Sequence, residues 1–355
     1  MTHSVGFIGA GGIASIHLET LDAVVESGTV GEDGAPCDIE LAAIADIDGE
    51  TARAAAGPRG ATVYTDGVEL IESESLDALV IAVPPFAHGE YERAAADRDL
   101  DLFIEKPVAL SMGDARETAR HLADSEGLSH VGYVCRYARI TEYARELLDG
   151  RRIGHIDSTY WVPVPESDWW RERRYSGGQI VEQSTHVYDL HRYLAGDVVA
   201  ATGSGTDGLL VGTIDFQDAT SVTLDHDSGA VSHVSSTCAS PTPRFEVRIA
   251  AEDAVLELDY MDHSLTGTVD GEPVEYDGDG EWYRREFEAF LRASATDHGE
   301  RRTNDVESVD IRSDFDDAAA TLDATLAARE AAETGEKVRT TVETPVDVSN
   351  AGTTL

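Results

Sequence analysis

A single lysine stands at a position suited to chemistry. Of the 27 basic residues only two are lysines, Lys106 and Lys337. Lys106 follows the apolar run Leu102 to Ile104 and Glu105, and it directly precedes Pro107. An ammonium group is compact and its pKa shifts readily on burial, whereas a guanidinium group stays charged. Because the apolar run predicts a buried strand, we interpret Lys106 as a catalytic candidate and Lys337 as a surface residue.

A second set of reactive side chains lies between Gly177 and Leu190. On a continuous helix, one stripe would carry Glu182, His186, Asp189 and Tyr193. The opposite side would carry the apolar residues Ile180, Val187, Leu190 and Leu194. The stripe could present a general acid or base with carboxylates that orient it, it could bind a metal, or it could be a solvated polar face. The pattern alone leaves these three interpretations open.

A glycine-rich turn near the N-terminus points to a phosphate ligand. The apolar run Ser4 to Ile8 is followed by Gly9-Ala10-Gly11-Gly12-Ile13-Ala14, which fits the pattern G-x-G-x-x-A. In this pattern Gly9 permits a tight turn, Gly11 lets the backbone approach a pyrophosphate, and Ala14 allows close packing of helix on strand. Backbone amides at the helix start would hold the phosphates. The turn predicts a dinucleotide site, and a glycine turn without a ligand is the alternative.

Asp46 ends the next predicted strand, Ile39 to Ala45. An acid at this place can accept both ribose hydroxyls and would repel a 2′-phosphate, which predicts NAD rather than NADP. It follows Ala14 by more than the usual ~20 residues, and we interpret the polar segment Glu26 to Asp38 as a loop insertion. The alternatives are that Asp46 is a solvated turn acid or that Asp48 takes its role.

The remaining elements of the first 130 residues alternate between strand and helix. Strands are predicted over Ala61 to Tyr64, Asp77 to Val83, Leu100 to Ile104 and His130 to Val134, and helices over 87–97 and Asp114 to Ser125. This alternation predicts a doubly wound parallel sheet, in which ligands bind beyond the carboxyl ends of the strands. Pro84, His88, Glu105 and Lys106 all follow strands, so we expect them at the ligand edge. His88 could line a nicotinamide pocket or cap its helix.

From residue 131 onward the pattern changes to a second domain. We expect a helix over 139–149, a strand over Ile156 to Val162, and a loop over Pro163 to Tyr175 whose Trp169-Trp170-Arg171 could cover a substrate or close a domain interface. Further strands are predicted over Leu210 to Phe216, Ser221 to Asp225, Val231 to Thr237, Phe245 to Ala250, Val255 to Leu258 and Val338 to Val348, and helices over Trp282 to Leu291 and Ser308 to Ala332. Turn signals between these strands favour an antiparallel sheet. We therefore expect a Rossmann domain over residues 1–130 and an α+β domain over 131–355.

The composition narrows the function further. The 68 acidic residues give a formal net charge of −41, and we expect such a surface to repel nucleic acid and anionic membranes. Many acids with almost no lysine are typical of proteins from halophilic archaea, and we interpret the charge as adaptation to concentrated salt. Cys37, Cys135 and Cys238 fit no paired metal spacing and predict free thiols in a reducing cytoplasm. No apolar run approaches the ~20 residues of a membrane span, so we expect a cytoplasmic protein.

Together these motifs resemble the glucose–fructose oxidoreductase, inositol dehydrogenase and MocA (Gfo/Idh/MocA) family. The residues that carry the resemblance are Gly9-x-Gly11-x-x-Ala14, Glu105-Lys106-Pro107, Gly177-Gly178 and Glu182-x-x-x-His186-x-x-Asp189. The resemblance implies a Rossmann domain, then a domain with a large, mostly antiparallel open sheet through which copies form a homo-oligomer, a dimer or a tetramer. It also implies that Lys106 is the catalytic lysine and His186 the catalytic histidine. Glu182 stands where many members have aspartate.

The activity implied by the resemblance is hydride transfer between NAD and a secondary alcohol of a sugar or cyclic polyol, in either direction. His186 would accept the hydroxyl proton and Lys106 would donate a hydrogen bond to the developing alkoxide. Glu182 would orient these groups, and Asp189 would hold His186 or a substrate hydroxyl. We also assign Arg136 and Trp170 to the substrate, and Gly12, Ile13, Pro84, His88 and Glu105 to the cofactor. The alternatives are an NAD-dependent glycosidase acting by transient oxidation, a non-catalytic NAD-binding sensor, and a metal enzyme.

Overall fold

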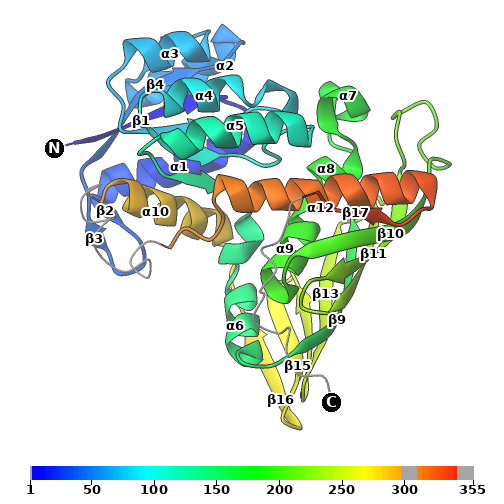
Figure 1. The fold of residues 1–355 in the computed structure, drawn as a ribbon. Coiled ribbons are helices and arrows are strands. Elements are labelled where there is room, and N and C mark those ends of the chain that lie inside the picture. Colours follow the sequence, from blue (N-terminus) through cyan, green and yellow to red (C-terminus); the bar gives the residue numbers. More distant parts are fainter. Residues whose placement is uncertain (1, 297–309, 342–355) are drawn as a thin grey trace.

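Two sheets organise the chain in the computed structural model, which describes residues 2–296 and 310–341 (Figure 1). The first sheet is wholly parallel, with the order β5-β4-β1-β6-β7-β8. Its strands are β1 (His3–Ile8), β4 (Ile39–Ala45), β5 (Thr62–Tyr64), β6 (Ala78–Ile81), β7 (Asp101–Ile104) and β8 (Ser129–Val131). The order along the sheet reverses between β1 and β6, and a Rossmann fold binds its dinucleotide at this crevice.

Helices cover both faces of this sheet, which explains why its central strands are mostly apolar. The covering helices include α1 (Gly12–Ser27), α2 (Gly49–Ala56), α3 (Gly67–Ser73), α4 (Glu90–Ala96), α5 (Met112–Asp124) and α10 (Trp282–Ser294). All four residues of β6 and of β7 are buried. A parallel strand buried on both faces needs apolar side chains at every position rather than at alternate ones.

The second sheet has nine strands in the order β16-β15-β14-β13-β9-β12-β11-β10-β17. Only β9 and β12 pair in parallel, and every other neighbouring pair is antiparallel. The strands are β9 (Ile153–Trp161), β10 (Val198–Thr206), β11 (Ala219–His226), β12 (Val231–Thr237), β13 (Arg244–Ala251), β14 (Ala254–Asp259), β15 (Ser264–Val269), β16 (Glu272–Asp277) and β17 (Val338–Arg339). The expected fold class, a Rossmann domain followed by a domain with a large antiparallel sheet, is confirmed.

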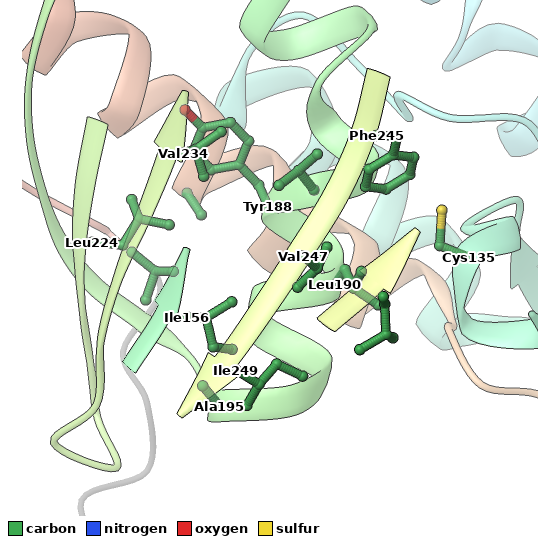
Figure 2. Close-up of a cluster of buried hydrophobic side chains, with 14 of the residues drawn as sticks. Cys135, Ile156, Tyr188, Leu190, Ala195, Leu224, Val234, Phe245, Val247 and Ile249 are labelled. Atoms are coloured by element: carbon green, nitrogen blue, oxygen red, sulfur yellow. The ribbon is translucent and has the colours of Figure 1, made fainter. Parts of the chain in front are cut away.

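Helices pack on one face of the second sheet and form its core. These helices are α6 (Arg139–Leu148), α9 (Thr185–Ala195) and α12 (Phe315–Thr334), and α12 crosses the molecule between the two sheets (Figure 1). Figure 2 shows Tyr188 and Leu190 of α9 against Ile156, Leu224 and Val247 of the strands. Alternation of buried and exposed residues along β11 to β14 gives the sheet one apolar face and one polar face.

Several predicted elements of the second domain were wrong. Residues 210–216 form a loop rather than a strand. The strand beside β11 is β10, which was missed because its second half is rich in glycine and threonine and lacks an apolar pattern. The polar strands β15 and β16 were missed for the same reason. The last long helix begins at Phe315 rather than near residue 308, which itself lies outside the described residues. The last strand covers only Val338–Arg339, and the predicted part from 342 to 348 is also outside them.

Two predicted elements of the first domain need correction. The insertion before Asp46 is not only a loop, because α1 extends to Ser27 and a short hairpin joins β2 (Thr29–Val30) to β3 (Ala35–Pro36). The helix expected from residue 87 starts at Glu90, after a 3-10 turn over Pro85–Ala87. Across 2–296 and 310–341, no helix has both the length and the apolar character needed to cross a bilayer.

Candidate active site

The glycine turn after β1 has the geometry of a phosphate cradle. Gly9 has φ +95°, and a Cβ there would lie 2.2 Å from the carbonyl oxygen of Ala82, so only glycine fits. A Cβ added at Gly11 or Gly12 would meet nothing within 4 Å, which leaves open space above the turn. Gly11 is the N-cap of α1 and supplies no side-chain cap, so the first amides of the helix remain available to an anion. Ala14 is fully buried where α1 packs on the sheet.

Asp46 lies beside this turn. One of its carboxylate oxygens accepts a hydrogen bond from the amide of Ala10 (2.9 Å), and the other accepts one from the amide of Asp48 (2.9 Å). Asp48 itself caps α2 and accepts from the amide of Glu50, which lowers the pKa of the Asp48 carboxyl. Asp46 therefore faces the turn, while Asp48 is engaged with its own helix.

Two cavities meet at the crevice between β1 and β6. The first, of about 280 Å³, is lined by residues that include Gly9, Gly11, Asp46, Thr65, Pro84 and Tyr91. The second, of about 410 Å³, is lined by residues that include Gly11, Gly12, Ile13, Pro84, Glu105, Lys106, Gly132, Trp169, Glu182, His186 and Tyr283. We call the second one the reaction cavity. Because the two share Gly11 and Pro84, they offer an elongated ligand a continuous path past the glycine turn. The open turn, the uncapped helix start and Asp46 together fit a nicotinamide dinucleotide.

Lys106 is held inside the reaction cavity by Glu182. Its Nζ donates to Glu182 Oε1 (2.9 Å) and to the Glu182 carbonyl oxygen (3.0 Å), and both side chains are about 15% exposed. Burial alone would lower the pKa of Lys106, but the carboxylates of Glu182 and Glu105 outweigh it and raise that pKa above 10.5. Lys106 is therefore an ammonium group at neutral pH.

His186 lines the same cavity in the opposite protonation state. Burial, and then the positive charge of Lys106, lower the pKa of His186 well below 6.5. Its Nδ1 is buried without a hydrogen-bond partner, so Nε2 is the ring nitrogen left to face a ligand. The ring lies edge-on to Tyr133, with the centroids 6.2 Å apart. The cavity thus contains a neutral imidazole and a charged ammonium group, a base and a hydrogen-bond donor.

The continuous helix expected to carry Glu182, His186, Asp189 and Tyr193 was wrong. Helix α8 ends at Glu182 and α9 begins at Thr185, so Gln183 and Ser184 break the helix. The predicted stripe also divides into two groups, and this division falls within α9 rather than at the break. Glu182 and His186 face the reaction cavity, whereas Asp189 does not.

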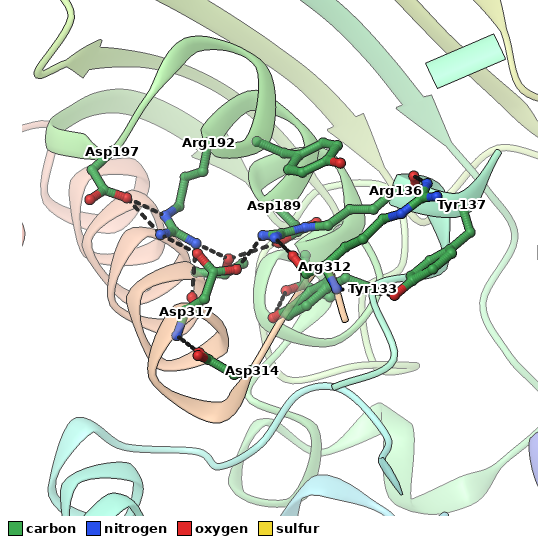
Figure 3. Close-up of polar contacts among 12 residues, drawn as sticks. Tyr133, Arg136, Tyr137, Asp189, Arg192, Asp197, Arg312, Asp314 and Asp317 are labelled. Carbon is green, nitrogen blue, oxygen red and sulfur yellow. Dashed lines mark hydrogen bonds and ion pairs between the residues drawn. The ribbon is translucent and has the colours of Figure 1, made fainter. Parts of the chain in front are cut away.

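Asp189 and Arg136 lie in a buried ion-pair network behind the cavity (Figure 3). Arg136 donates to both carboxylate oxygens of Asp189, at 2.9 and 2.6 Å, and Thr321 of α12 donates to one of them at 3.0 Å. Arg136 also pairs with Asp317, which in turn pairs with Arg192. Neither Asp189 nor Arg136 lines the reaction cavity, because their charges are satisfied by the network that joins α9 to α12.

Two further predicted site residues are also placed away from the cavities. The His88 side chain is fully buried and its Nδ1 lies 2.5 Å from Glu92 Oε1. Trp170 is 1% exposed, packs on Phe216 and donates its indole N–H to Glu182 Oε2 at 2.6 Å. The neighbouring Trp169 is the tryptophan that lines the reaction cavity. Nothing in the sequence distinguishes these adjacent tryptophans, because the turn of the 3-10 helix Asp168–Arg171 decides which one faces inward.

Sequence reasoning also missed some lining residues. Tyr283 comes from α10, far along the chain, and Ser167 comes from the loop before the 3-10 helix. Neither belongs to a recognisable motif. In the part of the chain that the structure describes, no group of three or more His, Cys, Asp or Glu side chains could hold a metal ion.

Comparison with known proteins adds to this geometry. Residues 3–133 match the family GFO_IDH_MocA, described as "Oxidoreductase family, NAD-binding Rossmann fold", and residues 141–257 match the GFO/IDH/MocA C-terminal domain. D-xylose 1-dehydrogenase (NADP(+)) 2 of Haloferax volcanii is 30% identical over 316 residues, which are 84% of this chain and 91% of that protein. The scyllo-inositol 2-dehydrogenase (NAD(+)) of Bacillus subtilis is 25% identical over 187 residues, 50% of this chain and 53% of that one.

Solved structures share the fold along nearly the whole chain. A levoglucosan dehydrogenase in complex with NADH has a TM-score of 0.82 at 21% identity, covering 96% of this chain and 99% of that one. The WlbA dehydrogenase of Bordetella pertussis, in complex with NADH and UDP-GlcNAcA, has a TM-score of 0.77 at 18% identity, covering 97% and 100%. The sequence matches and the shared two-sheet fold agree, and the chain belongs to the GFO/IDH/MocA family of oxidoreductases.

Proposed function

We propose that this protein is an NAD-dependent dehydrogenase that oxidises a secondary alcohol of a neutral sugar or cyclic polyol, or reduces the matching ketone. The observation that carries the proposal is that the Lys106 ammonium group and the His186 imidazole line one cavity with Gly11 and Gly12. The named dehydrogenases among the relatives support the substrate class.

The two side chains divide the work at the substrate oxygen. His186, kept neutral by its surroundings, accepts the hydroxyl proton. Lys106 uses two of its three N–H bonds on Glu182 and has one left for the same oxygen, whose developing negative charge it stabilises. NAD, when bound, supplies the hydride acceptor. Glu182 is held by Trp170 and fixes the direction in which the ammonium group points.

The preference for NAD over NADP rests on Asp46. Its carboxylate faces the glycine turn, where a 2′-phosphate would meet its negative charge. The Haloferax volcanii relative is named as an NADP(+) enzyme, so the preference is a property to be measured on this chain.

The charge of the reaction cavity supports a neutral substrate. Among its described lining residues the charged groups are Glu105, Lys106 and Glu182, and no arginine is present to bind a carboxylate or phosphate. A sugar acid or sugar phosphate would therefore enter a cavity with two carboxylates and one ammonium group.

The decisive experiment measures NADH formation in molar KCl with aldoses, inositols and sugar acids, using the native protein and the variant Lys106→Met. We expect turnover with at least one neutral substrate and loss of at least a thousandfold in the variant, with NADH binding retained. Lys337→Met is a matched control, because Lys337 is the only other lysine and pairs with Asp225 far from the cavity. Full activity of Lys106→Met would refute the mechanism.

We also propose that copies associate through the uncovered face of the second sheet and that the acidic surface suits concentrated salt. The outward side chains on β9 and β13 include Trp161, stacked by Arg244, and a charged pair between Asp157 and Arg248. Light scattering in 0.2 and 2 M KCl measures the oligomer size, and thermal unfolding at the same two concentrations measures the effect of salt on stability. A monomer at both salt concentrations, with unchanged thermal stability, would contradict both proposals.

A further inference from the structure

Glu105 is positioned from three sides at the wall of the reaction cavity. It directly follows β7 and is 5% exposed. Its Oε2 accepts from the backbone amide of Lys106 at 3.2 Å, and its Oε1 lies 2.8 Å from His17 Nε2. A carboxylate offers about four lone-pair sites, so two remain for a ligand hydroxyl in the cavity.

His17 comes from α1, one turn after Ala14, and is fully buried. Its ring is enclosed by aromatic rings, with centroid distances of 4.7 Å to Phe103, 4.9 Å to Phe287 and 6.5 Å to Tyr283. Among the described residues, Glu105 is the one hydrogen-bond partner of His17. The other ring nitrogen of His17, Nδ1, is buried and has no hydrogen-bond partner. The aromatic enclosure leaves the imidazole a single polar direction, toward Glu105.

The partner of His17 determines which of the two groups donates. A carboxylate can only accept, so Nε2 must donate to Glu105 Oε1. Nδ1 takes no part in this contact and has no partner among the described residues. The hydrogen bond therefore runs from Nε2–H of His17 to the carboxylate of Glu105.

Gly132 restricts the same carboxylate from the opposite side. A Cβ at Gly132 would lie 3.1 to 3.2 Å from the three atoms of the Glu105 carboxylate. Contacts this short would shift the carboxylate by a few tenths of an ångström, so glycine leaves room for its present orientation. Two residues that neither belong to a catalytic motif nor bond to each other thus converge on Glu105.

We propose that His17 is a positioning residue that, opposite Gly132, holds the Glu105 carboxylate where it accepts a hydroxyl of the nicotinamide-side ribose. The proposal rests on the function proposed above. His17 links α1, the helix that would hold the pyrophosphate, to the end of β7, which carries Lys106. The His17 side chain thus aligns both halves of the cofactor site.

The test is NADH affinity, measured by fluorescence titration without any sugar, in the native protein, His17→Leu, His17→Gln and Gly132→Ala. Leucine fills the aromatic enclosure but cannot donate, and we expect affinity to fall about tenfold or more. Glutamine can place a donor near the Nε2 position, and we expect affinity within about threefold of native. Gly132→Ala keeps His17 but displaces the carboxylate, so it should reproduce the loss seen with leucine.

Thermal unfolding and a double-mutant cycle separate positioning from general stability. In a Glu105→Gln background, His17→Leu should have little further effect on NADH affinity, because the two residues act as one unit. Losses of NADH affinity that add in the double mutant would overturn the proposal. Native NADH affinity in His17→Leu would also overturn it. So would a loss of affinity in His17→Gln as large as the loss in His17→Leu. A native protein that binds neither NADH nor NADPH would refute the proposed function as well, whereas native binding unaffected by His17→Leu refutes only the role of His17.

Discussion

The Glu182 carboxylate lies 2.9 Å from the ammonium nitrogen of Lys106, although the two residues belong to different sheet domains. Lys106 follows β7 of the parallel sheet, and Glu182 ends α8 on the side of the antiparallel sheet. The indole of Trp170 donates to the second oxygen of the same carboxylate at 2.6 Å. A glutamate is long enough to make both contacts at once, which gives its extra methylene a structural purpose.

Glu182→Asp should therefore lower kcat/KM by about tenfold or more, because the shorter side chain cannot keep both hydrogen bonds. Trp170→Phe should cause a smaller loss in the same direction, since the indole donor is removed while Lys106 keeps its partner. Steady-state kinetics with NADH titration as a binding control would check this. An aspartate variant with native kcat/KM would show that the bridge to Trp170 has no part in catalysis.

The pH profile of kcat/KM should be flat from about pH 6.5 to about pH 10.5. The pKa of His186 is lowered well below 6.5, so the base is already neutral above that value, and activity falls only at lower pH. The pKa of Lys106 is raised above 10.5, so the donor is lost only at higher pH. Glu182→Gln removes the negative charge that does most to raise the pKa of Lys106. The alkaline limb of the profile should therefore move to lower pH. An acid limb centred above pH 7 would contradict the assignment of His186.

Asp46→Ser should reduce the ratio of kcat/KM for NAD over NADP by at least tenfold, because it removes the charge that repels a 2′-phosphate. Asp48→Ala is the matched control. Asp48 caps α2, so its loss should cost about 1 kcal/mol of stability and leave the cofactor ratio unchanged. If Asp48→Ala changes the ratio and Asp46→Ser does not, Asp48 is the ribose ligand.

Asp189→Asn should destabilise the fold by about 3 kcal/mol, because it leaves the buried Arg136 with a poorer partner. NADH affinity and the KM for sugar should stay within about twofold of native. Chemical denaturation together with kinetics would separate the two effects, with Asp310→Asn, an exposed partner of Arg312, as the control expected to cost under about 1 kcal/mol. A tenfold rise in KM with stability intact would restore Asp189 as a substrate ligand.

The free energy of unfolding should fall as the pH drops below about 6.5. Burial lowers the pKa of His186, His191 and His226 below 6.5 and that of His130 to about 3. Between those values and 6.5 only the unfolded chain binds the protons, so each histidine lowers the free energy of unfolding by about 1.4 kcal/mol per pH unit. Burial raises the pKa of Glu286, which opposes this trend. Urea unfolding at constant KCl from pH 7.5 to 5 would measure the slope, and stability that rises on acidification would contradict it.

Much of the first domain could be predicted because its signals are local. Gly9, Gly11 and Ala14 have backbone and packing requirements that few other residues meet, and the apolar strands β6 and β7 reflect burial on both faces. Asp46 followed from its place after a strand. The second sheet was harder, because β15 and β16 are polar strands held mainly by their neighbours rather than by an apolar period.

By itself the sequence determined the alternation of strands and helices in the Rossmann domain and the open glycine turn. It also singled out Lys106, because lysine is scarce in this chain. Each of these features depends on residue type and short-range spacing. Tertiary structure decided which partners these residues meet. Glu182, before the helix break, meets Lys106, whereas Asp189, within α9, pairs with Arg136. The 3-10 turn Asp168–Arg171 brings Trp169, rather than Trp170, to the cavity. The physical reason is that contacts between distant segments depend on how two sheets and α12 pack together, and no periodicity within one segment contains that information.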